Sequence, residues 1–152
     1  FRAMSAAVTF ATIRIENEYG QLEKRNPLLH GILGEAAGHA FDELHGWIIC
    51  LSDIFRTPQE AAEVDRKSLE PGGLGMGRAP GSVSPHCVWR AADIRTRGID
   101  AARANALADW INSRWVYNPS DPVRKVADAK PHGTAPHVHI QTHPATRLRN
   151  PE

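Results

Sequence analysis

Two segments that lie far apart in the chain restrict its fold, because together they carry the side chains of a possible metal site. Residues 84–93 have the pattern S-x-H-x(6)-D, and residues 136–141 form an alternating run that contains His137 and His139. Zinc is bound in proteins by histidine nitrogen and carboxylate oxygen, and a catalytic zinc keeps one position open for water. A fold that joins these segments would supply two histidines and one aspartate.

The spacing within the first segment favours a turn that leads into a strand. His86 and Asp93 are too far apart to share one helical turn. The alternation that follows His86 predicts a strand at residues 88–95. One face of this strand would carry Trp89, Ala91 and Asp93, with His86 just before it at the rim.

The second segment predicts a strand at residues 136–142 that can supply the third ligand. His137, His139 and Gln141 alternate with apolar residues and therefore face the same side. The two histidines would be about 6–7 Å apart, so one can bind a metal ion while the other contacts a water or substrate. The alternative is a pair of structural histidines on a half-buried strand.

The rest of the chain predicts helices that alternate with short strands. Each helix has a capping signal, from Asn26 with Pro27, from Thr57 with Glu60, and from Asp100. The expected helices span residues 27–44, 58–68 and 101–115. The expected further strands are 8–15, for which a helix starting nearby is the competing interpretation, 47–51, and possibly 123–127.

Length and composition set the class of protein. The chain of 152 residues fits one domain, which we place at residues 5–143, and its net charge of +1 gives no nucleic-acid signature. No apolar run approaches the roughly 20 residues of a membrane helix, so we expect no integral membrane contact. Residues 1–4 resemble a cloning remnant, and residues 144–152 are expected to be a frayed tail.

Three further expectations concern processing and connections. No signal peptide follows Met4, which predicts a protein that begins its life in a cytoplasm. For Cys50 and Cys87, two buried thiols are favoured over a disulfide. The glycine-rich residues 70–84 predict a long loop, either a flap beside the site or a simple linker.

These motifs resemble those of the zinc peptidases that cleave bacterial cell walls. These are the D-alanyl-D-alanine carboxypeptidases and L-alanyl-D-glutamate endopeptidases, many phage endolysins among them, which share the hedgehog-type fold. The family pattern S-x-H-x-x-G-x-A-x-D is matched here by Ser84, His86, Ala91 and Asp93. The family's strand followed by S-G-Y-R-[ST] is similar to residues 51–57, which contain Arg56. The resemblance covers roughly residues 28–142, with the elements in the same order.

The resemblance implies a fold, a cofactor and a set of site residues. The fold would be α+β, with a small antiparallel sheet and helices packed on one side. His86, Asp93 and His139 would bind Zn²⁺, and Arg56 and Ser84 would contact the substrate. Arg56 would pair with a carboxylate of the peptidoglycan stem peptide or steady the developing oxyanion. The protein would act as a monomer, either cytoplasmic until its release or associated with a phage.

Two departures from the family pattern concern the cleft and the general base. Trp89 stands where the family has glycine, and Pro136 stands where many members place a Glu or Asp that acts as the base. Some relatives with a His-x-His ending use histidine instead, so His137 is the first candidate for the base, followed by His132 and Asp128.

The sequence therefore predicts a zinc-dependent peptidase acting on peptidoglycan stem peptides, as a carboxypeptidase or an endopeptidase. A second hypothesis is a non-catalytic module of the same fold that contains zinc and binds the cell wall or serves as a phage structural protein. Pro136 and Trp89 favour this second hypothesis. A third is a histidine-rich domain without a metal.

Overall fold

The computed structural model describes residues 8–68, 83–130 and 135–150 and shows an α+β protein. Its helices are α2 (Ile13–Arg25), α3 (Pro27–Glu43), α4 (Pro58–Ser68) and α5 (Ala101–Arg114), with a short 3-10 helix η1 (Pro85–Val88). Its strands are β1 (Val8–Phe10), β2 (Ile49–Asp53), β3 (Ala91–Arg95), β4 (Trp115–Val116), β5 (Ala127–Lys130), β6 (His137–Gln141) and β7 (Arg147–Leu148).

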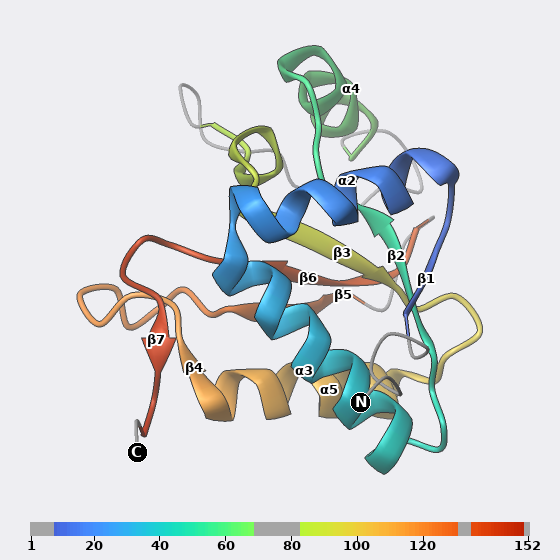
Figure 1. Ribbon diagram of the computed structural model, residues 1–152, viewed down its shortest axis with the longest axis vertical. Coiled ribbons are helices and arrows are strands. Elements are labelled where there is room, and N and C mark those ends of the chain that lie inside the picture. The colour runs from blue at the N-terminus through green and yellow to red at the C-terminus, as the bar shows by residue number, and fades with distance from the viewer. Residues whose placement is uncertain (1–7, 69–82, 131–134, 151–152) are drawn as a thin grey trace.

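The main sheet is mixed, which corrects the expected antiparallel sheet. Within the described residues its order is β1-β2-β3-β6-β5, and β1 runs parallel to β2 while the other neighbours are antiparallel. The parallel pairing is possible because α2 and α3 lie between β1 and β2 in the chain. These helices return the chain across the sheet before β2 begins (Figure 1). The central strands β3 and β6 pair over their whole length.

One face of the sheet carries the hydrophobic core. The apolar sides of β2, β3 and β6 pack with buried residues of α2, α3 and α5 in a single cluster, and Figure 1 shows α2 and α3 crossing in front of the sheet. The expectation that helices pack on one side thus holds for these three helices. Helix α4 is placed differently, near η1 and the end of β2. No helix among the described residues is long and apolar enough to cross a membrane.

The start of the chain differs from the strand expected at residues 8–15. Only Val8–Phe10 is extended, and α2 begins at Ile13 after Thr12, whose hydroxyl accepts the backbone N–H of Ile15. The competing helical interpretation is therefore the correct one from Ile13 onward. Burial of the apolar face of α2 against α3 outweighs the local preference of the β-branched residues for a strand.

The expected helix at 27–44 and its cap are confirmed. The Asn26 side chain accepts the N–H of Leu29, and Pro27 occupies the first helical turn. The helix ends at Glu43, and Gly46 follows with φ of 68°, in the left-handed region that glycine adopts without strain.

The second predicted cap is also confirmed, whereas the third is only partly correct. Thr57 and Glu60 exchange the reciprocal hydrogen bonds of a capping box at the start of α4. Asp100 occupies the N-cap position of α5, but its carboxylate binds Arg103 and makes no capping hydrogen bond.

Several other boundaries shift. The strand expected at 47–51 is β2, displaced towards Asp53, and the strand expected at 123–127 is wrong because β5 begins at Ala127. The expected frayed tail is wrong where Arg147–Leu148 pairs with β4, because this pairing fixes the chain against the end of α5. Cys50 and Cys87 are free, as expected, but both are only half-buried. The loop expected at 70–84 lies outside the described residues except for its last two positions.

Candidate metal centre

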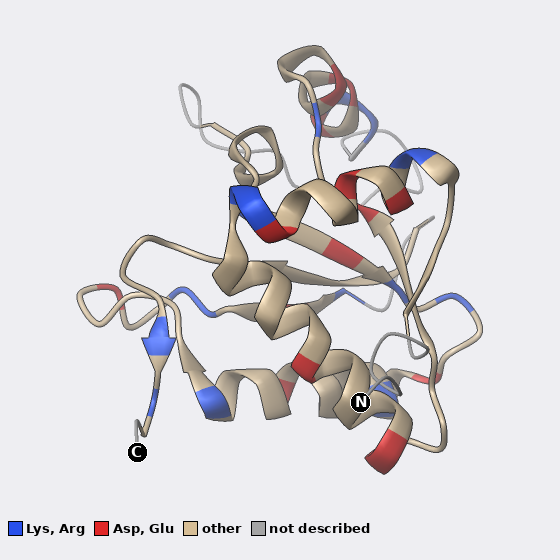
Figure 2. Cartoon of the chain, in the orientation of Figure 1, with Lys and Arg blue, Asp and Glu red and all other residues tan. Residues whose placement is uncertain are grey.

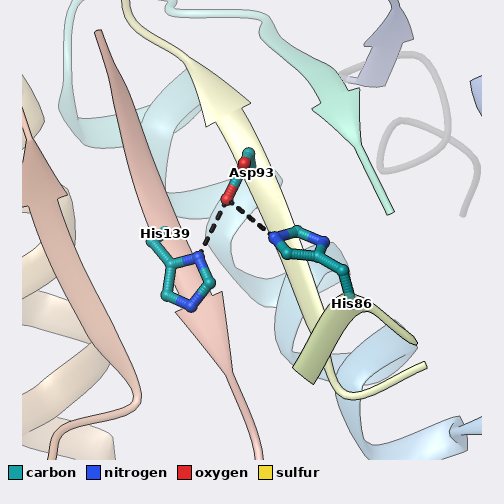
Figure 3. Close-up of side chains that lie close together, drawn as sticks. All are labelled: His86, Asp93 and His139. Carbon is teal, nitrogen blue, oxygen red and sulfur yellow. Dashed lines mark hydrogen bonds and ion pairs between the residues drawn. The ribbon is translucent and has the colours of Figure 1, made fainter. Parts of the chain in front are cut away.

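Three ligand-type side chains converge on the face of the sheet opposite the helices. Asp93 lies in the middle of β3 and His139 in the middle of β6, directly opposite each other in the strand register. His86 lies in η1, the turn that leads into β3, and points back over that strand (Figure 3). A turn followed by two paired strands thus joins the two segments that are far apart in the sequence.

The distances fit a metal site. His139 Nδ1 lies 2.9 Å from Asp93 Oδ1, and His86 Nε2 lies 3.5 Å from the same oxygen. One ligand atom from each of these residues lies within 4.8 Å of the other two. The group could hold a metal ion, and among the described residues it is the group that meets this test.

The strand register explains why Asp93 can reach His139. Residues directly opposite in an antiparallel pair project to the same face with Cβ atoms about 4.5–5.5 Å apart. The expected strand 88–95 is shorter than predicted because Trp89 adopts φ of 60° and ends η1, so β3 starts only at Ala91. This turn, rather than a continuous strand, brings His86 above Asp93.

Hydrogen bonds behind the site orient both histidine rings. His86 Nδ1 lies 2.9 Å from the carbonyl oxygen of Ile54, so Nδ1–H donates to that oxygen and Nε2 faces Asp93. His139 has the opposite arrangement, with Nε2 lying 3.3 Å from Gln141 Oε1 and Nδ1 facing Asp93. The two rings therefore present different nitrogen atoms to the centre.

Gln141 is itself held in place. Its Nε2 donates to the carbonyl oxygen of Lys125 at 3.3 Å, which leaves Oε1 turned towards His139. A hydrogen bond to the ring nitrogen that does not face the metal fixes the orientation of a metal-binding imidazole. Sequence reasoning placed Gln141 on the same strand face as His139 but gave it no role, although the strand alternation was a sufficient signal.

The charges of the centre favour an ionised aspartate. Burial alone would raise the pKa of Asp93, but the neighbouring His86 and His139 outweigh it, so this pKa lies well below its ordinary value. Burial likewise would lower the pKa of His86, but the Asp93 carboxylate raises it above the ordinary value. Asp93 is only 5% exposed, and a buried carboxylate with this environment is a suitable ligand for a cation.

Arg56 lies at the site, as the sequence predicted, but its contacts differ from the expected ones. Its Nη2 donates to Asp93 Oδ2 at 3.3 Å, and its Nε donates to Asp53. Its backbone N–H donates to the carbonyl oxygen of His86 at 3.3 Å. Arg56 thus connects β2 to the centre and holds the second oxygen of Asp93. Sequence reasoning missed Asp53, whose spacing of three residues from Arg56 is the signal that could have found it.

The candidates for a general base have different positions. His137 Nε2 lies 3.9 Å from Asp93 Oδ1, and its Nδ1 lies 2.9 Å from the carbonyl oxygen of Ala135. Asp128 lies opposite His139 on β5, but its side chain is 66% exposed and lies 3.9 Å from Lys130 Nζ. His132 lies outside the described residues. The structure therefore brings His137 to the centre and leaves Asp128 at its margin.

Two residues of the sequence pattern have structural roles. Ser84 is buried, and its hydroxyl accepts the backbone N–H of His86 at 3.3 Å, which starts η1. Its predicted contact with substrate stays a prediction. The indole of Trp89 stacks on Phe55 with ring centroids 4.9 Å apart, and Arg25 lies over it.

Comparisons with protein-family models, curated proteins and solved structures gave no match.

Proposed function

We propose that the protein is a zinc-dependent peptidase that hydrolyses peptide bonds in the stems of bacterial peptidoglycan. The observation that supports this most is the buried group of His86, Asp93 and His139, which combines two nitrogen donors with one carboxylate on a sheet face free of the main helical layer. Two histidines and one carboxylate form a ligand set of known zinc peptidases.

The resemblance to the cell-wall peptidases supports the same proposal. The ligands come from the positions that the family pattern assigns, and Trp89, which replaces the family's glycine, has φ of 60°. A backbone conformation of this kind is the one that favours glycine. We infer on this basis that the mixed sheet with its helical layer is a variant of the hedgehog-type fold.

His86, Asp93 and His139 would hold the zinc ion, which when bound supplies a Lewis acid that lowers the pKa of a coordinated water. His137 has the geometry of a proton acceptor, because its Nδ1 faces a backbone carbonyl and its Nε2 faces the centre. Its Nε2 would take a proton from the attacking water and return it to the leaving amine.

Arg56 would act on the carboxylate ligand and on the substrate. By donating to Asp93 Oδ2 it fixes the carboxylate plane, and its guanidinium can also donate to the oxyanion that develops on the substrate carbonyl. Because Asp53 and Asp93 both contact it, Arg56 is less suited to hold a substrate carboxylate.

A hydrolysis assay on purified peptidoglycan tests the proposal. The zinc-loaded protein is expected to release new amino termini or free D-alanine, and His86→Ala is expected to abolish both this release and zinc binding. Wall hydrolysis that continues in His86→Ala, with unchanged metal content, would rule out the scheme.

The second candidate is a zinc-containing module that binds the wall without hydrolysing it. It is favoured by Pro136, which replaces the usual acidic base, and by the two carboxylates that already engage Arg56. It predicts stoichiometric zinc and co-sedimentation with peptidoglycan, with no new amino termini. The same assay therefore separates the two candidates.

A further inference from the structure

A peptide that ends in a free carboxylate needs a cation near the scissile bond, and Arg56 is already engaged. Its guanidinium contacts Asp53 and Asp93, two carboxylates on neighbouring strands. A substrate carboxylate at Arg56 would place a third permanent negative charge next to both of these carboxylates, unlike the oxyanion, which exists only during the reaction. The charge that would bind a substrate carboxylate must therefore come from another part of this sheet face.

Such a charge lies one row further along the strands. The metal-binding row runs across the sheet through Asp93 and His139. In the strand register the next row on the same face consists of Arg95 on β3, His137 on β6 and Lys130 on β5. Residues two apart on a strand are separated by roughly 6.5–7 Å, so this basic row borders the centre.

The cations of the basic row (Arg95 and Lys130) are available to a ligand. Arg95 is exposed, and within the described part of the chain no carboxylate pairs with it. Lys130 Nζ lies 3.9 Å from Asp128 Oδ2, and the Lys130 side chain is 28% exposed while that of Asp128 is 66% exposed. An ion pair at this distance with a largely exposed carboxylate is weak and is readily exchanged for another anion. Figure 2 shows basic residues at the ends of β3 and β5.

We propose that Arg95 and Lys130 bind the free C-terminal carboxylate of the peptide, which would make the protein a carboxypeptidase rather than an endopeptidase. This inference rests on the proposed peptidase function. In a substrate whose last residue is the leaving group, the carboxylate lies about one residue, or ~3.8 Å, beyond the scissile bond. The long arginine and lysine side chains can cover the remaining distance to the neighbouring row.

The chemistry of the two cations suits a carboxylate. Arginine presents paired N–H groups that match both carboxylate oxygens, and lysine adds a second charge from the other side of His137. An endopeptidase substrate that continues through the α-carboxyl group of the residue after the scissile bond presents a neutral amide at this position, which gains little from such a pair of cations.

The test compares two probes that differ only in the carboxylate. N-acetyl-D-alanine and its C-terminal amide are titrated into the zinc-loaded protein and followed by NMR chemical shifts. The proteins are the wild type, the double variant Arg95→Gln with Lys130→Gln, and a charge-matched control, Lys24→Gln with Lys67→Gln, on α2 and α4. Hydrolysis of N-acetyl-D-alanyl-D-alanine is measured separately, and the thermal midpoint of each variant reports its folding.

The wild type and the control are expected to bind the acid about tenfold more tightly than the amide, since a charge-assisted contact contributes on this scale. The double variant is expected to lose this preference. Its KM for the dipeptide should rise about tenfold, with kcat within about twofold of the wild type. Equal binding of acid and amide to the wild type, or a preference that survives in the double variant, would overturn the inference. A preference for the acid without any hydrolysis of the dipeptide would instead support carboxylate binding by Arg95 and Lys130 and contradict the proposed peptidase function.

Discussion

The two faces of β6 differ completely, although their residues alternate along the same strand. Val138 and Ile140 are fully buried in the core under the helices, whereas His137, His139 and Gln141 are half-buried on the opposite face. The core face is held by apolar burial, which is non-directional, and the site face by a chain of oriented hydrogen bonds and charges. Substitutions on the two faces should therefore affect different properties.

The largest effect is expected at the aspartate of the centre. Asp93→Asn removes the charged ligand, so zinc content should fall to background and hydrolysis should be lost with it. Metal analysis of the purified variant measures this. Asp128→Asn is the matched control, because Asp128 flanks His139 from the other neighbouring strand but is exposed. Retained zinc in Asp93→Asn, or lost zinc in Asp128→Asn, would contradict the assignment.

The core face should respond in the opposite way. Ile140→Ala removes a fully buried side chain next to His139 in sequence and should lower the free energy of unfolding by about 2–5 kcal/mol. The folded variant should still bind zinc stoichiometrically, because the backbone and the ligands are unchanged. Chemical unfolding and metal analysis measure the two properties. A variant that keeps its stability but loses zinc would show that the faces are not independent.

The hydrogen bond behind His139 should have a smaller effect, limited to the metal. Gln141→Leu removes the acceptor of His139 Nε2 and should weaken zinc affinity about 10–100-fold. Gln141→Glu should retain or increase the affinity, since a carboxylate accepts the same hydrogen bond. Competition with a chelator measures both variants. Unfolding of the Gln141→Leu variant would contradict the claim that substitutions on the site face affect metal binding and not stability.

The sequence predicted the site better than it predicted the sheet. Alternation placed His137, His139 and Gln141 on one face, and capping residues located α3 and α4, because both signals are local. The parallel position of β1 and the pairing of β7 depend on contacts between distant segments, which no local pattern reports. For the same reason the contact of Arg56 with Asp93 could not be foreseen, since it requires the register of β2 with β3.

The smallest effect is expected at Trp89, where the chain passes from η1 into β3. The backbone of Trp89 has φ of 60°, which costs a residue other than glycine roughly 1–2 kcal/mol. The Trp89 ring gains contacts with Phe55 and Arg25. Trp89→Ala loses the ring contacts and keeps the strain, whereas Trp89→Gly loses the same contacts and relieves it. The glycine variant should therefore be the more stable of the two by about 1 kcal/mol, measured by chemical unfolding. An alanine variant of equal or greater stability would mean that residue 89 does not adopt the left-handed conformation. This turn would then not be what holds His86 over the strand.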